Sequence, residues 1–279
     1  MGTNWVLDNL KNAVNTWSDM FNQIWTLITV SPQNFKGGAV WDIIVGIHGG
    51  LKAIAFALLV LFFVIGVVKT TTNLSELKRP EVALKLFLRF AIAKIVVTYG
   101  MDLMLAMFRI VQGVIVEIAG NAPNIMAGNF AVPDIVQQKI MACGFFESIP
   151  LWIVALLGSL FITVLSFIMI LTVYSRFFQL YMYTALAPIP LSTFAGEGTS
   201  NVGKHFLKSY ISVCLQGAIV VLGCIIYSAF LSTPPQNIDE SLSTVQIVWN
   251  YIAELIFNML VLVGAVKMSD KIVKEMIGF

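Results

Sequence analysis

Charged side chains within an otherwise apolar stretch, residues 91–118, are the first candidates for chemistry. Asp102 and Arg109 lie seven residues apart, so they share one face of a helix. Glu117 falls within about 80° of that face at 100° per residue. A charge at the centre of a bilayer costs roughly 2.5–3.5 kcal/mol. We therefore expect a buried polar stripe that either pairs within the protein or lines an aqueous path.

A second polar stripe lies in the last apolar run of the chain. Asn250, Glu254 and Asn258 follow one another at four-residue steps, which places them nearly above one another on a helix. A carboxylate in such a run is typical of a pore or proton site. The alternative is a hydrogen-bonded contact between helices, for which asparagine neighbours are typical. Replacing Glu254 by Gln separates the two, because only the second predicts loss of the oligomer.

Basic residues gather near the ends of several apolar runs. Positive charge of this kind attracts phosphates in proteins that hold single-stranded nucleic acids. The alternative is that these residues only set the orientation of the chain in a membrane. The candidates for this basic mouth are Lys78, Arg79, Lys85, Arg89, Lys204 and Lys208.

The sequence contains no recognisable catalytic or metal-binding group. His48 and His205 lie in separate regions, and the three cysteines are too scattered for a zinc cluster or a disulfide framework. Residues 198–204 match half of a nucleotide-binding loop, but no strand is expected before them. His48 stands in the glycine-rich residues 46–50, a spacing that favours close helix approach. We predict no enzyme activity, no catalytic residue, no cofactor and no metal site.

The composition indicates a membrane protein. The chain is 58% hydrophobic and 11% charged, against roughly 45–50% apolar and about 25% charged in soluble domains. The net charge of +2 argues against a basic nucleic-acid module. A bilayer core of about 30 Å requires about 20 apolar helical residues. The sequence therefore predicts an all-α polytopic transmembrane protein. Five spans are expected, at residues 50–68, 91–118, 150–175, 209–231 and 244–266.

The N-terminal segment, residues 1–38, is predicted to contain an amphipathic helix rather than a cleaved signal peptide. Its apolar residues recur at alternating four- and three-residue steps, with asparagines and Asp19 on the other side. Such a helix lies on a membrane surface, against a partner helix, or against the rest of its own chain. The apolar positions are Leu10, Val14, Trp17, Phe21, Ile24 and Ile28.

The distribution of lysine and arginine predicts the orientation. Positively charged flanks remain in the cytoplasm. Nine such residues fall on the side of the C-terminus and three on the side of the N-terminus. We therefore expect an extracytoplasmic N-terminus, a transmembrane domain over residues 39–266 and a cytoplasmic tail over residues 267–279.

A further apolar segment, residues 177–195, contains two prolines and is not counted among the five expected spans. Pro188 and Pro190 should end any helix near Ala187. The 11 residues up to that point make only about 16 Å of helix. We therefore expect a re-entrant or interfacial segment that is packed in protein or lines a wet cavity. Arg176 is expected to anchor the interface or to donate to the carbonyls that the prolines leave free.

These residues carry a resemblance to a known family. Its signature is an arginine, an apolar half-helix and two spaced prolines, followed by a polar helix start. The matching residues are 173–176, 180–181, 185–190, 205–210 and 215–217. The chain resembles the TrbL-type polytopic inner-membrane subunit of type IV secretion and conjugation systems, in the version carried by conjugative elements of Gram-positive bacteria.

The resemblance implies a multi-pass protein of the bacterial plasma membrane that assembles as a homo-oligomer. It also implies neighbouring machine subunits, including cytoplasmic ATPases, and a position beside the route of single-stranded DNA and its attached protein. In some relatives a large extracytoplasmic loop contacts the substrate, whereas residues 119–148 here form a short loop with few charges. The alternative function is a small solute or ion transporter with a broken-helix site.

Overall fold

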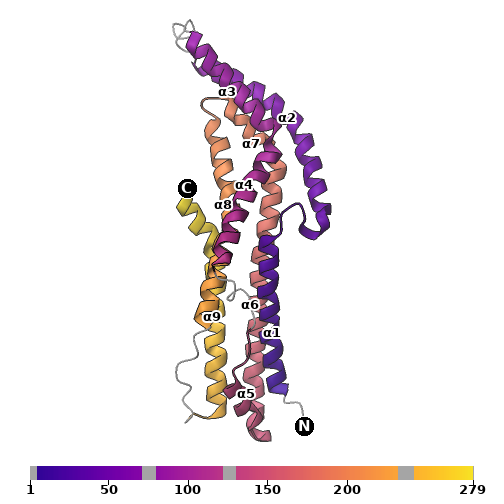
Figure 1. The fold of residues 1–279 in the computed structure, drawn as a ribbon, viewed down its shortest axis with the longest axis vertical. Helices are drawn as coiled ribbons and strands as arrows, with labels where there is room; N and C mark the ends of the chain where they lie inside the picture. The colour runs from indigo at the N-terminus through magenta and orange to yellow at the C-terminus, as the bar shows by residue number, and fades with distance from the viewer. Residues whose placement is uncertain (1–4, 71–79, 122–129, 232–241, 279) are drawn as a thin grey trace. The chain divides into compact units, whose positions relative to one another are not determined.

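The computed structural model describes residues 5–70, 80–121, 130–231 and 242–278, and within these ranges the chain is helical with no strand (Figure 1). The predicted all-α class is confirmed. The long helices are α1 (Trp5–Thr29), α2 (Ala39–Thr70), α3 (Pro80–Thr98), α4 (Gly100–Gly120), α6 (Phe145–Leu186), α8 (Ser200–Leu231) and α9 (Thr244–Ile277). The short elements are η1 (Phe35–Gly38), α5 (Asp134–Met141), α7 (Pro188–Ser192) and η2 (Thr193–Ala195).

Five helices are long and apolar enough to cross a membrane, counting only the part of the chain that the structure describes. The number of helices with this capacity equals the predicted number of spans. These candidate spans are Phe35–Lys69, Gly100–Gly120, Ile149–Leu186, Ser200–Leu231 and Thr244–Ile277.

The second span differs from the prediction. The expected helix over residues 91–118 is divided at Tyr99 into α3 and α4, and only α4 is a candidate span. Gly100 begins α4, and a Cβ atom there would lie 3.1 Å from Cδ1 of Leu191 on α7. Glycine has a low helix propensity and permits this close approach. Lys94 therefore belongs to α3 and lies outside the span.

The third span is also longer than predicted. α6 continues without interruption through Arg176 to Leu186, so residues 177–186 are not a separate half-helix. The predicted helix end near Ala187 is confirmed, since Pro188 begins the next helix, α7. Proline is favoured at a first helical position, where its missing N–H has no partner to lose. Whether this part of the chain is re-entrant stays a prediction.

The chain divides into two compact units, which we describe separately. The first unit comprises Met1–Thr29, Ile115–Ser175 and Gly217–Ser269. The second unit comprises Val30–Val114, Arg176–Gln216 and Asp270–Phe279.

In the first unit, α1 is the amphipathic helix that the sequence predicts, and its apolar face is buried. All six of the predicted apolar positions are no more than 2% exposed. Two aromatic contacts fix the helix to its neighbours: the Trp17 ring lies 5.8 Å from that of Tyr227 on α8, and the Phe21 ring lies 5.3 Å from that of Phe130. Of the alternatives for α1, packing within the chain is therefore the correct one for its apolar face.

In the second unit, a tight turn leads into α2. Lys36, Gly37 and Gly38 all have positive φ angles of 49–83°, a conformation that glycine adopts without strain. Phe35 in this turn stacks on Phe177 of α6 with ring centroids 4.1 Å apart. The hydroxyl of Tyr181 donates a hydrogen bond to the carbonyl of Pro32 at 2.9 Å. The turn is thereby fixed to the last part of α6.

The short elements α7 and η2 pack against α2 and α3 in the same unit. Two glycines meet at this contact: a Cβ atom on Gly66 would lie 3.2 Å from Cα of Gly196. A Cβ atom on Gly196 would lie 2.8 Å from the carbonyl oxygen of Phe62. Neither backbone leaves room for a side chain, so α2 and the turn after η2 are in direct contact.

Candidate functional site

The broken segment after α6 is held by a histidine that the sequence analysis did not connect with it. Pro188 has no N–H, so the carbonyl four residues earlier, that of Thr184, lacks its usual helical donor. His48 Nδ1 donates a hydrogen bond to this oxygen at 2.7 Å. His48 is 3% exposed and Thr184 is 2% exposed, so water cannot reach the Thr184 carbonyl to replace the missing helical donor. The His48 N–H therefore satisfies an acceptor that would otherwise be buried without a partner. The signal in the sequence was Pro188, which leaves the carbonyl four residues earlier without its helical donor.

Side chains satisfy further carbonyls of the broken segment. The hydroxyl of Ser192 donates to Ile189 at 2.6 Å, and that of Thr193 donates to Pro190 at 2.7 Å. Thr193 also accepts a hydrogen bond from the backbone N–H of Gly203 at 2.9 Å. Ala187, Leu191 and Ser192 are fully buried. The segment is thus packed in protein, as one of the two expected arrangements requires.

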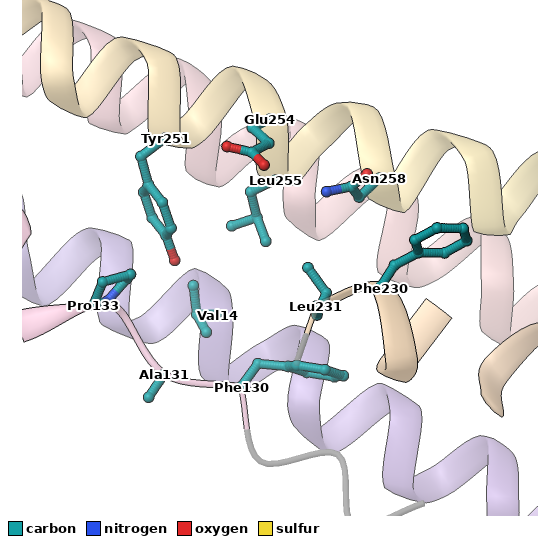
Figure 2. Close-up of a pocket in the computed structure, with 10 residues that line it drawn as sticks. All are labelled: Val14, Phe130, Ala131, Pro133, Phe230, Leu231, Tyr251, Glu254, Leu255 and Asn258. Atoms are coloured by element: carbon teal, nitrogen blue, oxygen red, sulfur yellow. The ribbon is translucent and has the colours of Figure 1, made fainter. Parts of the chain in front are cut away.

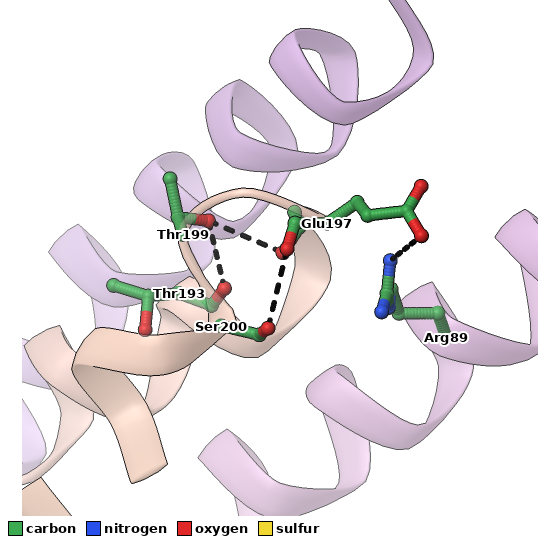
Figure 3. A network of polar contacts seen from close by, with 6 residues as sticks. Arg89, Thr193, Glu197, Thr199 and Ser200 are labelled. Atoms are coloured by element: carbon green, nitrogen blue, oxygen red, sulfur yellow. Dashed lines mark hydrogen bonds and ion pairs between the residues drawn. The ribbon is translucent and has the colours of Figure 1, made fainter. Parts of the chain in front are cut away.

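The turn from η2 into α8 carries a second polar network (Figure 3). The Thr199 hydroxyl donates to the Thr193 carbonyl at 2.9 Å, and the Ser200 hydroxyl donates to the Glu197 carbonyl at 3.3 Å. The Glu197 carboxylate points away from these bonds toward Arg89 on α3, with 3.7 Å between charged atoms (Figure 3). Both side chains of this ion pair are partly exposed, and exposed pairs contribute about 0–1 kcal/mol.

Arg176 does not play the hydrogen-bonding role expected for it. Its side chain is 3% exposed, and none of its guanidinium nitrogens has a hydrogen-bond partner among the residues described. The Thr184 carbonyl is occupied by His48 instead. Arg176 lies within electrostatic reach of Tyr210 and Cys214 on α8. Its other expected role, as an interface anchor, stays a prediction.

The first polar stripe is exposed rather than buried. Asp102, Arg109 and Glu117 on α4 are all exposed, and none of them forms an ion pair within the described ranges. Within the described part of the chain the stripe is neither buried nor paired, because the apolar positions of α4, such as Met104 and Phe108, face the protein instead. That the stripe lines an aqueous path stays a prediction. Facing outward, the three charges must meet water or another subunit.

The glycines near His48 are likewise exposed. A Cβ atom on Gly46, Gly49 or Gly50 would have no atom of the described chain within 4 Å. The close helix approach expected at this spacing is therefore absent from the described residues. His48 itself points the other way, toward α6.

The second polar stripe lines a pocket of the first unit, which we call the Glu254 pocket (Figure 2). Glu254 and Asn258 project into it from α9 together with Tyr251, and its volume is about 200 Å³. Asn250, the remaining member of the stripe, is exposed and does not line the pocket. The other lining residues are Val14, Phe130, Ala131, Pro133, Phe230, Leu231 and Leu255.

The residues of the basic mouth have different surroundings. Lys78 and Arg79 lie outside the described residues. Lys85 and Lys204 are exposed, and Arg89 is the partner of Glu197. The Lys208 ammonium donates to the Ile277 carbonyl at 3.5 Å. The positive charge is thus partly compensated, and its role toward phosphates stays a prediction.

A second pocket, of about 550 Å³, lies beside the broken segment in the second unit. Pro190 and Phe206 line it together with Asp270 and Lys274 of α9. The Asp270 carboxylate accepts hydrogen bonds from Gln216 at 2.8 Å and from Lys274 at 2.7 Å. Its charge is therefore already compensated within the unit.

No metal centre is evident in the described part of the chain. No group of three or more His, Cys, Asp or Glu side chains there could hold a metal ion. Cys143, Cys214 and Cys224 are free thiols. No residue set in these ranges indicates a cofactor.

Comparison with known proteins supports the resemblance noted from the motifs. Residues 18–188 match the model of a family described as TrbL/VirB6 plasmid conjugal transfer like protein. The match covers more than half of the chain, from within α1 to Pro188. No curated protein and no solved structure matches the chain.

Proposed function

The chain belongs to the TrbL/VirB6-like plasmid conjugal transfer family, and on this premise we propose that it is a membrane-embedded channel or scaffold subunit of a type IV secretion machine. In this role it helps single-stranded DNA and its attached protein to cross the bacterial plasma membrane. The observation that carries the proposal is the family match over residues 18–188, in a chain with five span-capable helices.

The two faces of α1 support a role beside an aqueous path. Its apolar face is buried in the first unit, while Asn12, Asn15, Asp19 and Asn22 on the other face are exposed. Lipid tails offer these polar groups no hydrogen bonds, so this face belongs next to water or a polar protein surface. A subunit of an assembly around a hydrophilic route would provide such a place.

The outward charges of α4 support assembly. Asp102 and Arg109 are exposed on a helix whose length and hydropathy suit a membrane span. Neighbouring subunits or a water-filled route would spare them contact with lipid. The proposed protein partners are further copies of this chain and other conjugation subunits, including cytoplasmic ATPases. The proposed partners also include membrane lipids and single-stranded DNA, which the chain would contact transiently.

Co-purification tests the proposal. A tagged copy is extracted in mild detergent from donor cells during conjugation, and a tagged unrelated multi-pass protein from the same cells is the control. We expect further copies of the chain and at least one conjugation ATPase to be enriched over the control. Recovery of the chain alone, with no machine component, would contradict the proposal.

A small solute or ion transporter is the second candidate, and the Glu254 pocket is the observation that favours it. Carriers use polar groups at broken or interior helices to hold their substrate. A carrier acts alone, so the purified chain in proteoliposomes would transport a solute without other subunits. A machine subunit is inactive in that assay.

A further inference from the structure

We propose that the Glu254 pocket binds an organic ammonium group, with the Glu254 carboxylate as its counter-charge. The pocket is formed within the first unit by α1, α8, α9 and the residues that precede α5. None of its lining residues belongs to the broken segment or to the basic mouth.

The negative charge comes from a single side chain. Glu254 is exposed into the pocket and forms no ion pair with any residue described in the structure. Most of the other lining side chains are apolar, such as Val14, Leu231 and Leu255. Opposite charges attract more strongly beside an apolar lining than in bulk water, so a cation in the pocket would pair with this carboxylate.

Aromatic rings make the pocket suitable for an organic cation. Phe130, Phe230 and Tyr251 all line it (Figure 2). A cation near the face of an aromatic ring is attracted by the ring quadrupole, and ammonium ligands are commonly held in this way. The rings and aliphatic side chains also suit the carbon atoms of such a ligand.

Polar groups beside the carboxylate favour an ammonium that carries N–H groups. Tyr251 and Asn258 line the same pocket as Glu254 (Figure 2). Their oxygens accept hydrogen bonds from a primary ammonium, which has three donors. An alkali or alkaline-earth ion would instead require a shell of several oxygen ligands, which this mostly apolar lining does not provide.

The pocket has room for a small ligand. Its volume is about 200 Å³, and one water molecule needs roughly 10–15 Å³ on the same measure. An aminoethyl group fits this space. We take the ligand to be a small amine or the ethanolamine head group of a lipid, and the experiment has one arm for each source.

The first arm titrates ethanolamine into the purified full-length chain in detergent and measures the heat of binding. We expect Glu254→Gln to weaken binding at least about tenfold, since one opposite charge is lost. Asp134→Asn is the matched control, because it also removes a carboxylate charge near the pocket but does not line it. It should leave the affinity unchanged.

Loss of binding in Glu254→Gln could also result from misfolding, so a second variant of the pocket is measured. Asn258→Leu keeps the carboxylate and removes an acceptor, and we expect it to weaken binding by several fold. Equal affinity of the wild type and both variants, or no binding to the wild type, would overturn the proposal. So would equally strong displacement of ethanolamine by sodium ions, which would indicate a simple alkali-cation site.

The second arm identifies the source by native mass spectrometry of the chain reconstituted with phosphatidylethanolamine or phosphatidylglycerol. Selective retention of phosphatidylethanolamine by the wild type, lost in Glu254→Gln, assigns the site to a lipid head group. Ethanolamine binding without such retention assigns it to a free amine. Neither arm depends on conjugation, so the result is independent of the proposed transfer function.

Discussion

A single buried hydrogen bond shows how the broken segment is stabilised. Pro188 removes the backbone donor that the Thr184 carbonyl would have in a continuous helix, and His48 supplies another from α2. A carbonyl has no hydrogen, so Nδ1 of His48 must carry the proton in this bond. The histidine is therefore a structural residue that connects α2 to the end of α6.

We predict that His48→Ala destabilises the protein by about 1–3 kcal/mol, the usual cost of an unsatisfied buried acceptor. The measurement is thermal unfolding of the purified chain in detergent. Pro188→Ala is the informative background, because alanine restores an N–H that can reach Thr184. In the Pro188→Ala protein, His48→Ala should cost less stability than it does in the wild type. The difference between the two costs, which is the interaction energy of the double-mutant cycle, should be about 0.5–3 kcal/mol. Strictly additive effects would show that the histidine does not replace the missing donor.

At the scale of elements, α1 has the clearest division between its two faces. Val14 and Trp17 are buried, at 2% and 0% exposed, while Asn15 between them is exposed. A helix of this type belongs between an apolar protein surface and a polar environment.

Cysteine labelling tests this arrangement in cells. We expect Asn15→Cys to react with a membrane-impermeant maleimide added outside, because its side chain faces outward and the N-terminus is predicted to be extracytoplasmic. Val14→Cys is the matched control and should remain unlabelled until the protein is denatured. Similar labelling of the two positions would contradict the buried face, and labelling of Asn15→Cys only after cell lysis would contradict the orientation.

The contact between α2 and the turn after η2 depends on the absence of side chains. We predict that Gly196→Ala destabilises the protein by about 1–3 kcal/mol, because the new Cβ would overlap the Phe62 carbonyl. Gly49→Ala is the matched control on α2, the helix that carries Phe62. A Cβ atom at Gly49 would meet no other atom of the described chain within 4 Å, so this change should be neutral or stabilising by up to about 1 kcal/mol. Thermal unfolding of the two variants side by side is the measurement. A Gly196→Ala protein as stable as Gly49→Ala would show that this contact does not exist.

The sequence predicted the helices better than their junctions. Periodicity identified the buried face of α1, and the prolines identified the end of α6. The division at Tyr99 was not predicted, and beside it Leu191 packs against Gly100, a contact between residues far apart in the chain. Helical spacing alone does not contain such tertiary information.

The candidate site shows the same limit. Spacing correctly placed Glu254 and Asn258 on one face of α9, but the pocket they line includes Phe130 from a distant segment. Spacing also placed Asp102 and Arg109 together, yet did not reveal that their face points outward. Which face of a helix is buried depends on its neighbours, and charge within an apolar run does not identify them.

For the whole molecule, the predicted topology has five crossings. α6 ends at Leu186 and α8 begins at Ser200, with the buried segment α7–η2 between them. If α6 and α8 each cross once, both ends of this short connection lie on the same side. The lysines near residue 204 and in the C-terminal tail predict that this side is the cytoplasm.

Reporter fusions test this topology. Fusions after Ser200 and after Glu275 should both report a cytoplasmic location. Two crossings, α8 and α9, separate the two fusion points, so both points lie on the same side of the membrane. An extracytoplasmic fusion after Lys139 is the control for the opposite side. Opposite locations for the Ser200 and Glu275 fusions would show that residues 177–195 cross the membrane separately and that the count of five is wrong.

The most direct test of the central claim, that this chain is a subunit of a conjugation machine, is the frequency of DNA transfer from a donor that lacks it. The gene is deleted in frame from the donor, and the wild-type chain is restored from a separate plasmid. We predict that transfer falls to background in the deletion strain and returns with the restored chain. Transfer at the wild-type frequency from the deletion strain, with the other transfer genes intact, would contradict the proposed function.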